Sequence, residues 1–152
     1  MAATVPPIPD SVLQALRANG IELEPRDPEL LRAYLQALLE ANERFNLTAI
    51  TEPLEMWTRH VQDSLTLVPF LVSAGAAKVI DVGSGGGLPG LPLAIVLPAV
   101  QFTLLESTGK KAAFLDETAR ALGLANVRVL NDRAETAGQD HHTHRADDIL
   151  TV

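Results

Sequence analysis

Apolar residues in the first half of the chain recur three and four positions apart, which is the spacing of an amphipathic helix. One helix is predicted over residues 11–19, with Asp10 capping its first turn. A second begins at Asp27, because the proline that follows suits the first turn and acids favour the positive end of a helix. A third begins at Thr51. Their buried faces are expected to comprise Val12, Leu13, Leu16, Leu30, Leu31, Tyr34, Leu35, Leu38, Leu39, Leu54, Trp57, Val61, Leu65 and Val68. Residues 1–74 are therefore predicted to form an N-terminal helical cap.

The pattern changes after Gly75, where short apolar runs alternate with helical segments. Strands are predicted over residues 78–82, 101–106, 126–130 and 148–152, and helices over residues 88–97 and 110–122. Strands and helices that alternate in this way form right-handed β-α-β units and a parallel sheet. The fold class is therefore predicted to be α/β, with a Rossmann-like sheet formed by residues 75–152.

A glycine-rich turn joins the first predicted strand to the first helix of this sheet. Residues 81–90 read Asp-Val-Gly-Ser-Gly-Gly-Gly-Leu-Pro-Gly. Such a turn lets a ligand approach the backbone closely and presents unpaired amides at a helix N-terminus. It contains the spacing G-x-G-x-x-G of dinucleotide sites, but that fingerprint should follow the strand directly, and here the strand ends in Asp81, before Gly83.

Charge distinguishes between two adenosine-containing ligands for this turn. A carboxylate from Asp81 at the mouth of the turn would repel the pyrophosphate of NAD. S-adenosylmethionine carries an ammonium and a sulfonium group and a single carboxylate, so a nearby acid favours it. S-adenosylmethionine is therefore the predicted cofactor, and an NAD-dependent oxidoreductase half is the alternative.

The ends of the next two strands carry further candidates for the adenosine site. Glu106 ends the second strand, where an acid in this class of fold bonds ribose hydroxyls, and both candidate ligands contain that ribose. After the third strand, Asp132 or the backbone amides of Ala134 and Glu135 are placed to read the adenine edge. A polar turn that caps the next helix explains the same residues equally well.

Composition and charge exclude several kinds of site and restrict the possible partners of the chain. Apolar residues make up 47% of the 152, and the absence of cysteine excludes disulfides, thiol catalysis and cysteine-based zinc sites. No apolar run reaches the ~20 residues of a spanning helix and the first ten residues do not resemble a signal peptide, so a cytoplasmic location is expected. The net charge of −7 restricts any RNA contact to a local basic rim. Lys110 and Lys111 either belong to such a rim or are ordinary surface lysines.

Two other clusters of chemically active side chains do not predict a functional site. His60, Asp63 and Ser64 share a helical face, but no nucleophile elbow surrounds the serine, so a hydrolase is not expected. The histidines within residues 141–144 lie in a polar stretch without suitable carboxylates, so a solvated loop is preferred and no metal site is predicted.

Several segments occur in an order that resembles one family. They are residues 46–50 (Asn-Leu-Thr-Ala-Ile), 59–65 (Arg-His-Val-Gln-Asp-Ser-Leu), 81–92, and 103–115 with the start Thr-Leu-Leu-Glu-Ser. Over residues 30–135 the chain resembles the RsmG family, also called GidB. The resemblance implies a bacterial S-adenosylmethionine-dependent methyltransferase that modifies N7 of a guanine in small-subunit ribosomal RNA.

The resemblance also implies roles for particular residues. The donor site would comprise Gly83, Leu88, Glu106, Ser107, Thr108, Ala134 and Glu135. Arg59 and His60 would shape the substrate side. Guanine N7 has a lone pair and no proton to remove, so no catalytic acid or base is named, and catalysis is expected to come from proximity.

Members of this family continue beyond the fourth strand with an arginine-bearing motif and further strands, whereas this chain ends at Val152. The resemblance therefore implies a sheet truncated after its fourth strand, with an unpaired edge strand and with donor affinity and activity reduced or lost. The expected partner is small-subunit ribosomal RNA in a ribosomal particle, and the expected state is a monomer, without a membrane or a metal. A non-catalytic fragment of such an enzyme is a second alternative.

Overall fold

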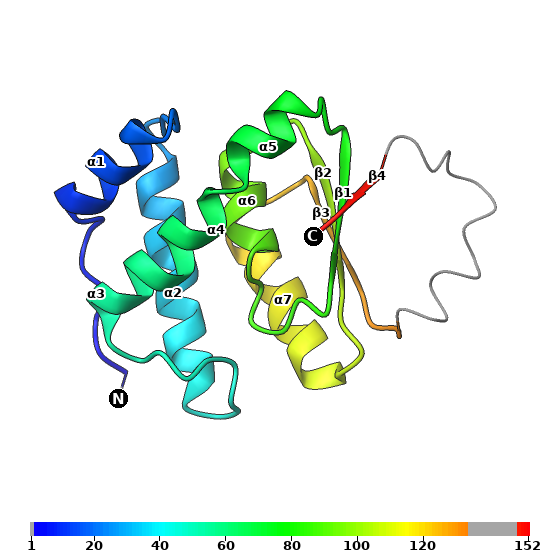
Figure 1. Cartoon of the computed structure of the whole chain (residues 1–152). Coiled ribbons are helices and arrows are strands. Elements are labelled where there is room, and N and C mark those ends of the chain that lie inside the picture. Colours follow the sequence, from blue (N-terminus) through cyan, green and yellow to red (C-terminus); the bar gives the residue numbers. More distant parts are fainter. Residues whose placement is uncertain (1, 134–148) are drawn as a thin grey trace.

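The computed structural model describes residues 2–133 and 149–152 of the chain. A helical part comes first and a parallel sheet follows it (Figure 1). The helices before the sheet are α1 (Asp10–Ala18), α2 (Asp27–Asn42), α3 (Pro53–Met56), the π-helix η1 (Trp57–Gln62), α4 (Asp63–Leu65) and α5 (Val68–Ser73). The sheet part comprises β1 (Lys78–Val82), α6 (Gly90–Val96), β2 (Gln101–Leu105), α7 (Gly109–Ala121), β3 (Val127–Leu130) and β4 (Ile149–Thr151).

The sheet has the strand order β3-β2-β1-β4, and every described pair of strands is parallel. Val79 of β1 aligns with Phe102 of β2, which aligns with Val127 of β3, so these side chains share one face. Helices α6 and α7 cover that face (Figure 1). The prediction of an α/β fold with a Rossmann-like parallel sheet is confirmed.

The carboxyl ends of the strands meet at one edge of the sheet, and this edge positions the site. The glycine turn after β1 and the start of α7 after β2 both lie there. Helix α2 packs against α6 and α7, and its C-terminal end lies at the same edge (Figure 1). The helical part is therefore in direct contact with the turns that follow the strands.

Several helices begin at residues other than the predicted ones. Asp10 is the first residue of α1, and Pro9 is the residue before the helix. The third helix begins at Pro53 behind Glu52, because the Glu52 carboxylate accepts hydrogen bonds from the amides of Leu54 and Glu55 at 3.1 and 2.7 Å. Helix α6 begins at Gly90, two residues later than expected, because the preceding residues form a turn.

The predicted third helix is not one regular helix. Helices α3, η1 and α4 follow one another without a break, and the middle segment has π-helical hydrogen bonding, which no apolar spacing indicates. Helix α5 was not expected as a separate element. The apolar residues of α5 do not all lie on its buried face, since Phe70 and Val72 are 71% and 63% exposed. The spacing of apolar residues along the sequence therefore does not show a helical period.

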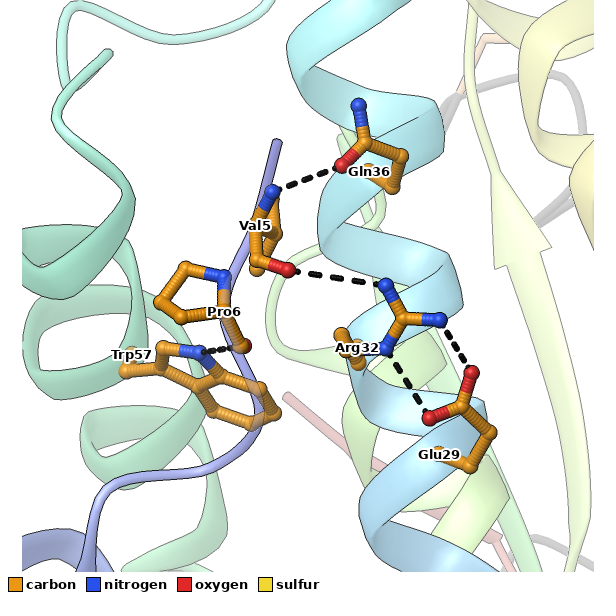
Figure 2. A network of polar contacts seen from close by, with 6 residues as sticks. All are labelled: Val5, Pro6, Glu29, Arg32, Gln36 and Trp57. Atoms are coloured by element: carbon orange, nitrogen blue, oxygen red, sulfur yellow. Dashed lines mark hydrogen bonds and ion pairs between the residues drawn. The ribbon is translucent and has the colours of Figure 1, made fainter. Parts of the chain in front are cut away.

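The N-terminal segment before α1 lies between α2 and η1 (Figure 2). The Val5 amide donates to Gln36 Oε1 at 2.8 Å, and the Val5 carbonyl accepts from Arg32 at 3.5 Å. On the other side, the indole of the fully buried Trp57 donates to the Pro6 carbonyl at 3.0 Å. These contacts brace α2 against η1. Across the part of the chain that the structure describes, no helix has the length and apolar character needed to cross a membrane.

Candidate functional site

The glycine turn between β1 and α6 has a conformation that depends on its glycines. Gly83, Gly85 and Gly87 have φ angles of 72°, 55° and 97°, which side chains rarely adopt. A Cβ atom on Gly87 would also lie 2.6 Å from Leu91 Cδ1. The sequence prediction that this segment is a specific turn, rather than a flexible linker, agrees with this geometry.

Several amides of the turn are used within the protein. Those of Gly83 and Ser84 donate to the Leu105 carbonyl at 2.8 and 3.2 Å, and that of Gly87 donates to the Ser84 carbonyl at 2.7 Å. The remaining amides, those of Gly85, Gly86 and Leu88, have no hydrogen-bond partner in residues 2–133 or 149–152. Gly85 and Leu88 are half-buried, so their amides are candidate donors to a ligand with a negatively charged group, whereas Gly86 is buried.

Asp81 is buried beneath the glycine turn, whereas the sequence prediction placed its carboxylate at the mouth of the turn. The residue is 2% exposed, and its Oδ2 atom accepts a hydrogen bond from the Gly90 amide at 3.0 Å. The pKa of Asp81 is raised to about 6, chiefly by burial and to a smaller extent by the nearby Glu106 carboxylate, while hydrogen bonds from Gly90 and Ser84 oppose the shift. The carboxylate is therefore mostly charged at neutral pH and contributes negative potential from below the turn.

Glu106 lies at the end of β2, where the sequence placed it. It is 6% exposed, and its amide donates to the Leu130 carbonyl at 2.9 Å. Its own carboxylate has no hydrogen bond or ion pair with any residue that the structure describes. No side-chain oxygen in the described residues is both fully buried and without a partner, so the carboxylate oxygens of Glu106 reach the surface. The Glu106 carboxylate is therefore available to hydroxyl groups.

Sequence reasoning missed Asn131, which joins the ends of β2 and β3. Its side-chain amide, oriented by its hydrogen bonds, donates to the carbonyls of Glu106 and Ser107 at 3.1 Å each. The Asp132 amide also donates to the Glu106 carbonyl at 3.1 Å. These bonds fix the backbone that carries Glu106. A polar residue directly after a strand was the only available signal.

The structure describes some, but not all, of the other predicted donor-site residues. Leu88 is half-buried in the turn, and Ser107 and Thr108 are exposed between β2 and α7. Thr108 precedes α7 without a side-chain hydrogen bond to the helix. Gly83, Leu88, Glu106, Ser107 and Thr108 are all brought to the carboxyl edge of the sheet. The predictions for Ala134 and Glu135 lie outside the described residues.

Tyr34 is a second residue that sequence reasoning assigned only to the core. It is fully buried in α2, and its hydroxyl donates to the Gly86 carbonyl at 2.7 Å. Burial raises the pKa of Tyr34 well above its usual value, and the negative charge of Asp81 adds to the shift, so the hydroxyl stays protonated and donates. A tyrosine in an apolar helical stripe gives no indication of this long-range contact.

Arg59 and His60 are neighbours in η1, and consecutive residues of a helix do not share a face, so their side chains lie in different environments. The Arg59 side chain is 64% exposed and pairs with Glu55 at 2.9 Å. His60 is 8% exposed, and its Nε2 atom lies 2.8 Å from the hydroxyl oxygen of Thr48. Burial lowers the pKa of His60, so the ring is neutral at pH 7.

The segment that carries Thr48 lies against the glycine turn. Asn42 Oδ1, at the end of α2, accepts hydrogen bonds from the amides of Leu47 and Thr48 at 2.7 and 2.9 Å. Leu47 Cβ is 3.5 Å from the position that a Cβ atom of Gly86 would occupy. His60 is therefore connected to the turn through Thr48 and Leu47, whereas Arg59 is not. Within residues 2–133 and 149–152 there is no group of three or more acidic or histidine side chains that could hold a metal. The histidines at 141–144 lie outside the described residues.

Comparison with known proteins identifies sequences similar to this chain. The model of the GidB family, described as rRNA small subunit methyltransferase G, matches residues 27–151. Proteins named ribosomal RNA small subunit methyltransferase G are 51% identical in Sorangium cellulosum, 50% in Ectopseudomonas mendocina and 47% in Xanthomonas campestris. The matches cover 86%, 84% and 94% of this chain, and 55%, 59% and 69% of the relatives' own lengths. The chain thus spans little more than half of the first two.

Solved structures share the fold at low sequence identity. A candidate O-methyltransferase from Klebsiella pneumoniae superposes with a TM-score of 0.61 at 18% identity, covering 94% of this chain and 57% of its own. An O-methyltransferase from Bacillus cereus, crystallised with S-adenosylhomocysteine (SAH), gives a TM-score of 0.57 at 18% identity, covering 93% of this chain and 60% of its own. At this identity the likeness supports the Rossmann-like fold alone.

Proposed function

The chain belongs to the GidB family, and from this premise we propose that it binds S-adenosylmethionine and methylates N7 of a guanine in small-subunit ribosomal RNA. The observation that carries the donor site is the carboxylate of Glu106, a nearly buried residue at the end of β2 that has no side-chain partner among the described residues. It lies at the same edge of the sheet as the turn whose amides at Gly85, Gly86 and Leu88 also have no partner in that part of the chain. An acid can bind the ribose hydroxyls, and the amides of the turn can bind a carboxylate. These two groups match the two polar ends of S-adenosylmethionine.

Each predicted donor residue has a place in this proposal. The turn from Gly83 to Leu88 would bind the methionine part of the cofactor through its amides. Glu106 would accept hydrogen bonds from the ribose, and Ser107 and Thr108 would line the same side. Ala134 and Glu135 are proposed to contact the adenine, by resemblance to the family. The acid Asp81 beneath the turn favours a ligand with positive charges over one with a pyrophosphate.

The reaction makes modest demands on the protein. S-adenosylmethionine supplies an electrophilic methyl group, and the N7 lone pair accepts it without loss of a proton. The residues of the chain therefore need only bind, orient and exclude water, and no general base is required. His60 is buried, neutral and linked to the turn through Thr48, so we propose that it shapes the substrate side. Arg59 is proposed to contact the RNA from the exposed rim.

A local basic rim supports an RNA substrate in spite of the acidic net charge. Arg44 lies three residues before Leu47, which packs against Gly86. Lys110 and Lys111 lie in the first turn of α7, one turn before Leu115, whose Cδ2 atom is 3.1 Å from the Cβ position of Gly87. The three cations therefore lie within five residues of side chains that contact the glycine turn.

The basic residues of this rim have no acidic partner. Arg44, Lys110 and Lys111 have no ion pair within the described ranges. Away from the carboxyl edge, Arg32 pairs with Glu29 and Arg120 pairs with Asp116, whereas Arg17 has no acidic partner among the described residues, so it is the position beside the turn that sets the rim apart. Unpaired cations beside a donor site are suited to RNA phosphates. We further propose that the protein acts on a ribosomal particle, in the cytoplasm and as a monomer.

Thermal unfolding with and without SAH tests the donor site directly. A ligand at ~100 times its dissociation constant stabilises the folded state by about 2.7 kcal/mol, so a clear rise in Tm is expected. NADH at the same concentration serves as the control and is expected to produce no rise. A rise with NADH alone would favour an oxidoreductase. No rise with either ligand, for a protein that unfolds cooperatively, would mean that residues 1–152 do not form the donor site by themselves.

A further inference from the structure

We propose that Tyr34 is a positioning residue for the donor turn, whose hydroxyl holds the Gly86 carbonyl toward α2 so that the free amides of the turn face the cofactor. The proposal rests on the proposed donor site and adds to it a residue from the helical part of the chain. Tyr34 itself does not touch the cofactor in this arrangement, since it is fully buried beneath the turn.

The contact between α2 and the turn is made by two residues of one helical face. The Tyr34 hydroxyl is 2.7 Å from the Gly86 carbonyl oxygen, in a buried hydrogen bond between residues 52 positions apart. Leu38, one helical turn later, places its Cδ1 atom 3.0 Å from the Cβ position of Gly86. Leu38 therefore packs closely against position 86, where an added Cβ atom would force the leucine side chain to shift by a few tenths of an ångström.

The hydrogen bond fixes a complete peptide unit. The carbonyl of Gly86 and the amide of Gly87 belong to one rigid plane and point in opposite directions. Tyr34 binds the carbonyl end, while the Gly87 amide donates to the Ser84 carbonyl at 2.7 Å. The plane is therefore held at both ends. The unpaired amides of Gly86 and Leu88 lie on either side of it, so its orientation determines where they point.

The orientation matters because the two faces of a peptide carry opposite partial charges. If the plane rotated, the Gly86 carbonyl oxygen would turn toward the cofactor, where it would repel the methionine carboxylate. The fully buried Tyr34 hydroxyl is the described group that prevents this rotation at the carbonyl end. Preorganised dipoles of this kind act without reorganisation when the ligand binds.

Helix α2 is itself braced, which gives the hydroxyl a fixed position. Gln36 and Arg32, on either side of Tyr34 in sequence, bind the backbone of Val5 in the N-terminal segment (Figure 2). The same segment is bound by Trp57 of η1 through the Pro6 carbonyl. The helical cap (residues 1–74) and the sheet part (residues 75–152) are thus proposed to act as one unit in donor binding.

The test compares Tyr34→Phe with Val12→Ala in the full 152-residue chain. The first substitution removes only the hydroxyl, and the second removes buried methyl groups from α1, away from the turn. SAH affinity is measured by titration calorimetry at a temperature where all variants are folded. Tyr34→Phe should raise the Kd for SAH about tenfold, because the Gly86 carbonyl loses its hydrogen-bond donor and the peptide unit is no longer held in one orientation. Val12→Ala should leave the Kd within about twofold of the parent, whatever its loss of stability.

Amide hydrogen exchange gives a readout that does not need the cofactor. In Tyr34→Phe, protection of the Gly87 amide should fall much more than protection of the Phe102 amide, which donates to the Asn126 carbonyl at 2.8 Å in the sheet. In Val12→Ala both amides should change together. An unchanged Kd in Tyr34→Phe, or an equal loss of protection at both amides, would overturn the proposal.

The two experiments separate this proposal from the proposed function. If the parent chain does not bind SAH, the donor site fails, and exchange at Gly87 still decides whether Tyr34 holds the turn. If the parent binds SAH and Tyr34→Phe binds it equally well, the donor site stands and the positioning role is rejected.

Discussion

The Oδ2 atom of Asp81 accepts a hydrogen bond from the Gly90 amide at 3.0 Å, beneath the glycine turn. This contact joins the end of β1 to the first residue of α6, so the strand and the helix enclose the turn in one arrangement. Gly90 permits the contact because it has no side chain. A Cβ atom there would lie 2.4 Å from Leu104 Cδ2 and 2.6 Å from Asp81 Oδ2.

Gly90→Ala is therefore expected to lower the free energy of unfolding by about 1–3 kcal/mol, because the added methyl group overpacks the interface between β1, β2 and α6. Gly109→Ala at the start of α7 is the matched control, since among the described residues its Cβ atom would meet only the side-chain amide of Asn131, at 3.7 Å. Urea unfolding at neutral pH measures both. Equal stability of the two variants would show that the Asp81 side of the turn can rearrange freely.

Asp81 should also make stability depend on pH. Its pKa of about 6 in the folded chain lies above its value of ~3.9 in the unfolded chain. Between these values the folded chain keeps a proton that the unfolded chain has lost, so this group contributes less stability as the pH rises through the window. Relative to Asp81→Asn, the free energy of unfolding of the parent should fall by about 2 kcal/mol between about pH 4 and about pH 7. A constant difference across that range would contradict the burial of this carboxylate.

Glu106→Gln tests the proposed contact with ribose. The amide keeps the shape of the side chain but replaces a carboxylate oxygen by a donor and removes the charge. The Kd for SAH is expected to rise about tenfold or more, because hydrogen bonds to a charged acceptor are stronger than those to a neutral one. Glu117→Gln, on the exposed face of α7, removes the same charge and should leave the Kd unchanged. Equal binding by both variants would remove Glu106 from the donor site.

The sheet was predictable from the sequence because its signals are local. Short apolar runs separated by turn residues located β1, β2 and β3 to within one residue at each end, and the glycines marked the turn. The hydrogen bond from Tyr34 to Gly86 was not predictable, since its partner lies 52 residues away and its neighbours in α2 are apolar. The π-helical hydrogen bonding of η1, which carries Arg59 and His60, was not predictable either, because the spacing of apolar residues does not reveal it. Local patterns thus located the glycine turn and the strand ends where the donor site is proposed, whereas long-range contacts determine how the helical part packs against them.

Lys110→Glu tests whether the basic rim binds RNA, against Arg17→Glu as a control with the same change in net charge. Both cations are exposed and have no acidic partner in the described part of the chain, but Arg17 lies in α1, outside the carboxyl edge of the sheet. If the rim contacts phosphates, Lys110→Glu should weaken binding of small-subunit ribosomal RNA several-fold and lower the slope of log K against log salt by about 1. Arg17→Glu should change neither quantity beyond the small effect of net charge. Because both variants shift the overall charge equally, an equal loss in the two would assign RNA binding to long-range electrostatics, and only a selective loss in Lys110→Glu supports a defined contact beside the donor turn.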